Sequence, residues 1–530
     1  MKLTYRYWLL AALLVGLLTR IPGIFWGYNF PTGWAFHHPD EWPHLINAET
    51  LINPLLPPKW SHPYPKGLAA HAAVPVLAAR LLQGQLMVKS REEMEQPPER
   101  AKIFLLGRIV SVLYGVGTIL VVYLLGRRLF QSPWVGLTGA GILALGGLHV
   151  SQSHFFVADA SALFWWSVGT LLLLRHVQDD PRSESALLWA GFSFGVAFGV
   201  KLWLASIPSL FLVAAWQRPR ILRILHSGIF FLAGFVIVNF AAYTPFDLYK
   251  TLVRGVGDPY EFTVWSNVRL YLVELPSIVS FPFLLLALAA LYPLARKLFL
   301  PVNRPRLPAL LMIVGLPLFI QLFLTAVKLD HFPRHIVAFI PWLALAAGWS
   351  LVWLSTKLWT RGFHPALVCF PVFAYLAVFV YDGEKGYLRE PRNEAAKWIQ
   401  QHIAPGTLIS WEGQHLFSGY EHTGFPSPKR PCLVAVDMYR ANHYLSGMGW
   451  KNSYPRDIRY IFDAMSQERV DAYQVLFKGQ TEYREVARFG EGYFMPEYLL
   501  ADALLGNRSR NYISEVVIFS NGTCPKPAGN

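Results

Sequence analysis

The amino-acid sequence predicts a polytopic α-helical membrane protein that ends in a small C-terminal α/β domain. Of its 530 residues, 54% are hydrophobic and only 15% are charged, and the mean hydropathy is +0.33. This composition lies outside the range of ordinary soluble globular proteins. Apolar runs long enough to cross about 30 Å of hydrocarbon recur through residues 1–381. Residues 382–530 have a mixed charged and polar composition instead.

The first apolar run begins after Lys2 and Arg6 and looks at first like a signal peptide. No small-residue cleavage site follows it, and Arg20-Ile21-Pro22 closes the run. We therefore expect an uncleaved first span that also acts as the insertion signal.

The hydrophobic part contains enough runs for about eleven spans, counted to within about two because the breaks near Asp159 and Lys201 are short. The runs lie near residues 8–25, 103–125, 133–150, 160–175, 186–200, 202–216, 226–244, 270–292, 308–326, 335–354 and 364–381.

The placement of Lys and Arg sets the predicted orientation. If the N-terminus is cytoplasmic, every second connection is basic, as the positive-inside rule requires. The basic connections hold Arg127-Arg128, Arg175 with Arg182, Arg218-Pro219-Arg220 with Arg223, Arg296-Lys297 with Arg304 and Arg306, and Lys357 with Arg361. The outer side then receives the loop 26–102, the turn around Asp159, the loop 245–269 and the tail. We expect a multi-pass plasma-membrane protein with an extracytoplasmic tail.

The formal net charge of the chain is +14, from 47 Lys and Arg against 33 Asp and Glu. Basic residues at helix ends suit contacts with anionic membrane lipids. Because no nucleic-acid motif accompanies them, we expect no nucleic-acid partner.

The outer loop 26–102 and the tail each contain predicted structure. An Ala- and Leu-rich stretch, 67–88, should be an interfacial or re-entrant helix, because one more span would reverse the sign of every later loop. In the tail, residues 393–402 suit an amphipathic helix and 407–411 a strand, which predicts a small α/β domain. Cys432 and Cys524 lie in the tail, and they either pair in an oxidising compartment or remain two unrelated thiols.

Asp40 and Glu41 are the strongest indication of chemistry. They follow the first span, where acids are costly to keep near lipid, so we expect them to be used. The alternative is a pair that caps a helix. The histidines nearby are possible metal ligands, although their spacing matches no zinc signature and an oxygen-liganded divalent cation is a further alternative. These histidines are His37, His38, His44 and His62.

Asp159 is a second carboxylate predicted on the same side of the membrane. Two outer acids from different helices can provide a base and an orienting or metal-binding group, although Asp159 could also be an N-cap. Cations are predicted on this side as well, against the usual bias, which favours phosphate binding over snorkelling. The cationic candidates are Arg108, Lys201, Lys328, His331, Arg334 and His335.

The order of these motifs over residues 1 to about 430 resembles the polyprenyl-phosphate-sugar-dependent glycosyltransferases of the GT-C superfamily. The similarity is to the protein O-mannosyltransferase and aminoarabinose-transferase type (glycosyltransferase family 39-like). Lys66 stands where the family often has a second proline, and His335 where it has an aromatic residue. The motifs are His38-Pro39-Asp40-Glu41, Tyr64-Pro65-Lys66-Gly67, Gly107-Arg108-Ile109-Val110-Ser111, Tyr123-Leu124-Leu125-Gly126-Arg127-Arg128-Leu129-Phe130, Asp159, Gly195-Val196-Ala197-Phe198-Gly199-Val200-Lys201 and Arg334-His335-Ile336-Val337-Ala338-Phe339-Ile340-Pro341.

The resemblance implies that Asp40 is the catalytic acid or base, with Glu41 beside it and Asp159 as the second acidic group. It also implies that Arg108 contacts the phosphate of a lipid-linked sugar donor. We expect Lys201, Arg334 and His335 to complete the phosphate site, and a glycan, lipid or protein to accept the sugar with inversion. A transporter or flippase for a lipid-linked precursor is the alternative. A non-catalytic scaffold would leave the paired acids unexplained.

Overall fold

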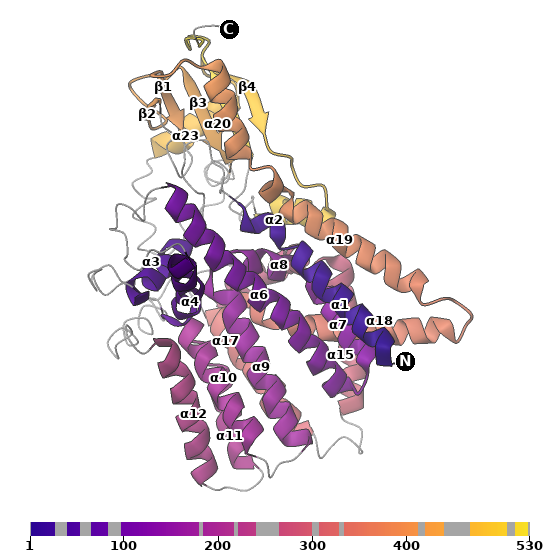
Figure 1. The fold of residues 1–530 in the computed structure, drawn as a ribbon. Coiled ribbons are helices and arrows are strands. Elements are labelled where there is room, and N and C mark those ends of the chain that lie inside the picture. Colours follow the sequence, from indigo (N-terminus) through magenta and orange to yellow (C-terminus); the bar gives the residue numbers. More distant parts are fainter. Residues whose placement is uncertain are drawn as a thin grey trace.

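The computed structural model describes residues 2–26, 40–52, 65–82, 97–179, 184–216, 221–239, 264–298, 307–327, 333–411, 419–438, 467–505 and 515–527. The predicted fold class is confirmed, because a large helical part carries a small C-terminal sheet domain (Figure 1). His37, His38, His62, Lys328 and His331 lie outside the described residues.

The helical part follows the apolar runs of the sequence. Its elements are α1 (Lys2–Leu18), α2 (Ile21–Ile24), α3 (Glu41–Ile52), α4 (Gly67–Leu82), α6 (Pro97–Phe130), α7 (Pro133–Ala144), α8 (Gly147–His154), α9 (Ala158–Gln178), α10 (Ser185–Lys201), α11 (Ser206–Trp216), α12 (Ile221–Asn239), α14 (Val264–Val279), α15 (Phe281–Leu298), α16 (Leu307–Leu310), the π-helix η3 (Leu311–Gly315), α17 (Leu316–Val327), the 3₁₀-helix η4 (Pro333–Phe339), α18 (Ile340–Trp359) and α19 (Ala366–Leu388).

Within the described ranges, seven helices are long and apolar enough to cross a membrane, or up to nine if each bent pair is one span. The bent pairs are α7 with α8, at 61°, and α14 with α15, at 112°. Two further predicted runs form α10 and α11, which are too short to satisfy that length. The predicted interfacial stretch is α4, also a short apolar helix.

Helices α10 and α12 pack backbone against backbone. Gly191, Gly195 and Gly199 recur every four residues on α10, so they share one face. A Cβ atom at Gly195 would collide with the carbonyl oxygen of Phe231, and one at Gly234 with that of Phe192. Small residues at such spacing let helices approach closely in a membrane. This contact positions the C-terminal end of α10.

The tail forms a five-stranded mixed sheet in the order β2-β1-β3-β5-β4. Its strands are β1 (Leu408–Trp411), β2 (Glu421–Thr423), β3 (Leu433–Asp437), β4 (Arg484–Phe489) and β5 (Val516–Ser520), and its helices are α20 (Pro391–His402), α23 (Gln467–Phe477) and α24 (Pro496–Leu505). Strand β1 is parallel to β2 and β3, whereas β5 is antiparallel to β3 and β4.

Alternate residues of β3 face opposite sides of this sheet, as the pleat requires. Leu433 and Ala435 pack in the cluster that contains Ile399 of α20, whereas Val434 and Val436 pack with the residues of α23. The predicted α/β domain therefore has a helix on each face. The helix predicted over 393–402 and the strand predicted over 407–411 agree with α20 and β1.

The structure pairs Cys432 with Cys524, whose Cα atoms lie 5.1 Å apart. One cysteine precedes β3 and the other follows β5, so the bond links the ends of two neighbouring strands. Of the two alternatives that the sequence left open, the structure has the disulfide. Cys369 in α19 has a free thiol.

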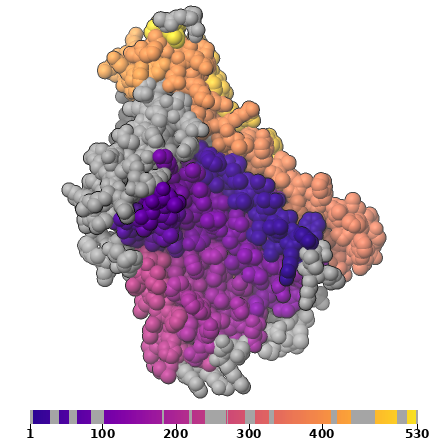
Figure 2. Space-filling view, in the orientation of Figure 1, coloured from indigo at the N-terminus to yellow at the C-terminus, as the bar shows by residue number. Residues whose placement is uncertain are grey.

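The tail rests on the helical part through shared core. Helix α19 runs without a break across residue 381 and ends at Leu388, so the predicted domain boundary falls inside a helix. Near its end, Tyr387 packs with Trp26 and Phe155, with ring centroids 5.5 to 5.7 Å apart. Figure 1 shows α19 extending towards the sheet, and Figure 2 shows the tail standing on the helical body.

Candidate functional site

The first ion pair of the site joins Asp40 to Arg334, 294 residues later. Asp40 directly precedes α3, the position of a helix cap, and Arg334 lies in η4. The Arg334 guanidinium Nη1 donates to Oδ2 of Asp40. Both side chains are about one-fifth exposed, at 23% for Asp40 and 20% for Arg334. A molecule outside the protein can therefore reach this pair.

The second ion pair joins Asp159 to Lys201. Asp159 lies in the first turn of α9 and Lys201 is the last residue of α10, so the neighbouring helices bring the two residues together. The N-cap of α9 is Val157, which rules out the N-cap alternative for Asp159. Asp159 is buried, whereas 21% of the Lys201 side chain is exposed, and the ammonium lies 5.8 Å from the Trp203 ring centroid.

These two ion pairs form one group, which we call the charge cluster: Asp40, Asp159, Lys201 and Arg334. Lys201 interacts electrostatically with Asp40 and Arg334 as well as with Asp159. The two carboxylates and two cations balance in formal charge. The structure thus brings together four of the residues that the sequence predicted as a site.

Glu41 and Arg108 form a separate buried pair. Arg108 Nε and Nη2 donate to the two Glu41 carboxylate oxygens at 2.8 and 2.9 Å. Oε1 of Glu41 also accepts from the backbone N–H of Phe156 at 2.8 Å. Arg108 Nη1 donates to the carbonyl oxygens of Ile24 and Trp26, at 3.1 and 2.5 Å. The pair therefore ties together the end of α2, the start of α3, α6 and the link from α8 to α9.

This geometry gives Glu41 and Arg108 a supporting position. Glu41 has no exposed surface and Arg108 only 2%, in contrast to the partly exposed charge cluster. The guanidinium also lies 5.6 Å from the ring centroids of Trp26 and Phe104. In this structure both residues engage protein groups next to the segments that carry Asp40 and Asp159.

His335, which the sequence also predicts at the phosphate site, is buried. Its Nδ1 lies 3.2 Å from the hydroxyl of Tyr271 on α14. Arg334 points to Asp40 while its neighbour His335 contacts α14, so η4 is held from two directions.

The histidine beside the acids that the structure describes is also part of the core. His44 is buried in α3, with its ring 5.9 Å from that of Phe156. Among the described residues, no three His, Cys, Asp or Glu side chains come together as ligands for a metal ion.

The sequence did not predict a buried hydrogen-bond network that reaches the end of α10 next to Lys201. Lys66 is buried, and its Nζ donates to Asn47 at 2.7 Å. Its backbone N–H donates to Oδ1 of Asn239 at 2.7 Å, and the Asn239 amide donates to the carbonyl oxygen of Gly199 at 3.1 Å. Gly199 precedes Lys201 by two residues. The sequence feature that could have indicated this network is Lys66, the one charged residue of the motif Tyr64-Pro65-Lys66-Gly67.

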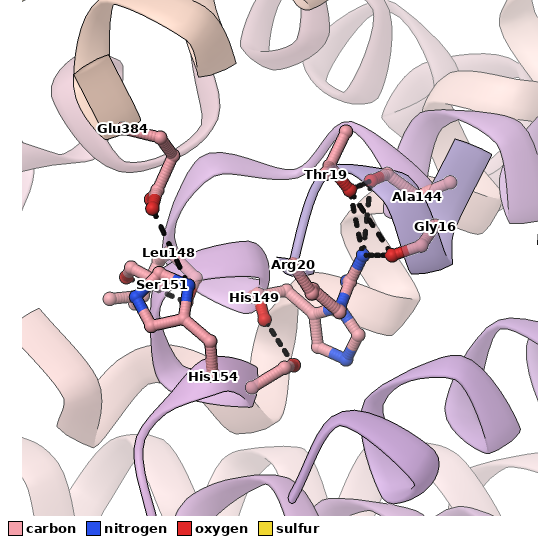
Figure 3. A network of polar contacts seen from close by, with 10 residues as sticks. Gly16, Thr19, Arg20, Ala144, Leu148, His149, Ser151, His154 and Glu384 are labelled. Atoms are coloured by element: carbon pink, nitrogen blue, oxygen red, sulfur yellow. Dashed lines mark hydrogen bonds and ion pairs between the residues drawn. The ribbon is translucent and has the colours of Figure 1, made fainter. Parts of the chain in front are cut away.

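A second missed network lies between α1, α8 and α19 (Figure 3). Arg20 is fully buried and contacts His149 Nδ1 at 2.6 Å and the carbonyl oxygen of Gly16 at 2.6 Å. His154 Nδ1 lies 3.5 Å from Oε2 of Glu384. This network joins the first span to the helix that enters the tail.

The chain is similar to known membrane glycosyltransferases. The family model described as dolichyl-phosphate-mannose-protein mannosyltransferase matches residues 77–251, a stretch that contains Arg108, Asp159 and Lys201. The undecaprenyl phosphate-alpha-4-amino-4-deoxy-L-arabinose arabinosyl transferase of Pseudomonas aeruginosa is 30% identical over 116 residues, and that of Pseudomonas paraeruginosa is also 30% identical over 116 residues. Each match covers 21% of this chain and 21% of the relative, so the chain spans about a fifth of the length of these relatives.

Two solved structures align with most of this chain at low sequence identity. The archaeal oligosaccharyltransferase AglB from Archaeoglobus fulgidus, in complex with an inhibitory peptide and a dolichol-phosphate, has a TM-score of 0.49 and 12% identity, over 97% of this chain and 88% of that chain. ArnT from Cupriavidus metallidurans bound to undecaprenyl phosphate has a TM-score of 0.45 and 15% identity, over 98% of both chains.

The helical membrane fold and the sequence matches agree with the similarity to GT-C glycosyltransferases that the motif order predicted. Within the chain, it is residues 77–251 that are similar to the dolichyl-phosphate-mannose-protein mannosyltransferase family.

Proposed function

We propose that the protein transfers a sugar from a polyprenyl-phosphate donor to an acceptor at the extracytoplasmic surface, with inversion at the anomeric carbon. The observation that supports this most is the charge cluster, in which two carboxylates and two cations meet in a partly exposed site. Such a site offers a base and phosphate-binding cations together.

In the proposed reaction Asp40 is the base. It removes the proton from an acceptor hydroxyl or amine as that atom attacks the anomeric carbon. The bond from the anomeric carbon to the phosphate oxygen breaks, and its electron pair stays on the departing phosphate. A single displacement of this kind uses no enzyme-linked sugar, so the anomeric configuration inverts.

We assign the donor phosphate to Lys201 and Arg334, the two cations of the charge cluster. Fixed cations stabilise the negative charge that develops on a leaving phosphate. Asp159 holds Lys201 in place through their ion pair. Glu41, Arg108 and His335, which the sequence also suggested for the site, act as positioning residues because each is buried against protein groups.

Two observations support an extracytoplasmic tail and, with it, an outer active site. The basic connections alternate along the sequence as the positive-inside rule requires. The Cys432–Cys524 disulfide suits an oxidising compartment, since cytosolic thiols are kept reduced. The donor would then be a polyprenyl-phosphate sugar of the plasma membrane, and the acceptor a glycan, lipid or protein outside it.

The test of Asp40 uses purified protein, a polyprenyl-phosphate sugar and candidate acceptors, with free polyprenyl phosphate as the readout. Asp40→Asn should fold normally and lose a factor of about 10² to 10⁴ in rate, because the amide keeps the shape but not the basicity. Asp179→Asn is the matched control, since Asp179 pairs with Arg128 at the other end of α9.

Near-normal transfer by folded Asp40→Asn protein would remove Asp40 as the base. If the wild-type protein moved intact donor across vesicles and released no polyprenyl phosphate with any acceptor, the transporter alternative would replace the transferase.

A further inference from the structure

We propose that Arg334 changes partner during the reaction, from the carboxylate of Asp40 in the resting enzyme to the phosphate of the departing lipid. Arg334 would thus be the cation that follows the negative charge from base to leaving group. This inference rests on the proposed transferase function and adds a partner exchange to it.

The structure contains two contrasting Arg–carboxylate pairs on adjacent acids. Glu41 and Arg108 are buried, doubly hydrogen-bonded to each other and bound to three backbone groups, so their arrangement is fixed. Asp40 and Arg334 keep about one-fifth of their side chains exposed. Only modest desolvation opposes a rearrangement of a partly exposed pair, whereas breaking a buried pair is strongly unfavourable. Arg334 is therefore the arginine that can move.

The charge balance of the reaction explains why a move is needed. A sugar phosphodiester carries one negative charge, and the released phosphate monoester carries about −1.5 to −2 near pH 7. The acceptor proton meanwhile neutralises Asp40. The net charge of the site stays nearly constant, but one negative charge moves from the carboxylate to the phosphate.

Arg334 can follow this charge without leaving the cluster. A guanidinium binds carboxylate and phosphate oxygens with the same planar fork, and it cannot lose its own proton. Lys201 differs because its partner Asp159 is buried and gains no proton in the proposed step. Lys201 would hold the phosphate throughout, while Arg334 would join it as the bond breaks.

The decisive measurement is binding of undecaprenyl phosphate, a probe of the product lipid, to purified full-length protein in nanodiscs made of uncharged lipids. Asp40→Asn imitates the protonated base and removes the carboxylate that competes for Arg334. It should therefore bind the probe about three- to tenfold more tightly than wild type. Arg334→Gln should bind about ten- to a hundredfold more weakly.

The double variant makes the coupling specific. Asp40→Asn should give no gain in binding when Arg334→Gln is already present, because no guanidinium remains to be released. Asp179→Asn, which removes a carboxylate from an exposed pair elsewhere, should bind as wild type does.

The outcomes separate this inference from the proposed function. A wild-type protein that neither binds the probe nor transfers a sugar would reject the transferase proposal itself. If wild type binds and transfers, but folded Asp40→Asn binds equally or less well, the partner exchange is wrong and the transferase stands.

A pH profile of transfer gives a second readout, which tests the resting Asp40–Arg334 pair that the exchange requires and does not need Asp40→Asn to fold. The positive charge of Arg334 favours the ionised form of Asp40. In Arg334→Gln the carboxylate should therefore take up a proton at higher pH, and the acidic limb of kcat/KM should move to higher pH. Arg334→Lys should restore the position of that limb while keeping a lower kcat. An unchanged limb in Arg334→Gln would overturn the inference.

Discussion

Asp40 and Glu41 are neighbours in sequence, yet the fold gives them different surroundings. Asp40 is partly exposed and pairs with Arg334, whereas Glu41 is buried and pairs with Arg108. The exposed acid is suited to exchange a proton with a substrate, and the buried acid is suited to hold backbone segments in place. Two neighbouring acids in the sequence thus become one partly exposed ion pair and one buried ion pair.

This division predicts a stability effect at the anchor. Arg108→Ala should destabilise the protein by about 3 to 5 kcal/mol, because Glu41 would remain buried without its counter-ion. The double change Glu41→Leu with Arg108→Met should recover part of that loss, since it removes both charges. Thermal unfolding in detergent measures both. An unchanged midpoint in Arg108→Ala would show that Glu41 does not depend on Arg108.

The sequence identified Asp40, Asp159, Lys201 and Arg334 because charged residues at the outer ends of spans need a reason to be there. It could not assign partners among them, since Asp40 and Arg334 are 294 residues apart. The sequence likewise could not pair Arg108 with Glu41, 67 residues away, and the family resemblance predicts Arg108 at the phosphate of the sugar donor instead. Its contacts with the backbone at Ile24 and Trp26 depend on tertiary packing and leave no trace in a local motif.

At the scale of elements, the positions of helices followed from the apolar runs, but their bends did not. An apolar run has the same composition whether the helix is straight or broken. Helices α14 and α15 meet at 112° around Ser280, which has a positive φ of 77°. The backbone N–H of Phe281, at the start of α15, is bound by Glu497 of the tail at 2.8 Å. The bend therefore has a hydrogen-bond partner that lies 216 residues away in the sequence.

The glycine contact between α10 and α12 gives a prediction for elements. Gly195→Ala should destabilise the protein by about 1 to 3 kcal/mol, because its Cβ would overlap the backbone of Phe231. It should also impair transfer, since α10 ends at Lys201. Gly228→Ala on α12 is the matched control, because its Cβ would meet Phe211 at an ordinary 3.6 Å.

Thermal unfolding and transfer assays on the two variants check this. The free energy of unfolding of the control should lie within about 0.5 kcal/mol of the wild-type value or slightly above it, since alanine favours a helix. Equal free energies of unfolding for the two variants would contradict the inference that α10 and α12 need their close backbone contact for stability.

For the whole molecule, the alternating basic connections predict a cytoplasmic N-terminus and an extracytoplasmic tail. Reporter fusions after Arg128 and after Glu384 should therefore give opposite signals, and protein from intact cells should contain the Cys432–Cys524 disulfide. The free Cys369 serves as the internal control for thiol labelling. Equal reporter signals, or labelling of all three cysteines without reductant, would contradict this orientation.

The aromatic cluster of Trp26, Phe155 and Tyr387 links the helical part to the tail, so the two parts do not have independent cores. Ala395, Ala396 and Ile399 of the tail belong to the same core as Trp26 and Phe155. A tail produced alone would lose one wall of its own core. We therefore expect that a chimaera with its junction at residue 382, carrying the tail of a relative, would fold poorly. A functional chimaera would have to bring the end of α2 and the link from α8 to α9 from the same parent.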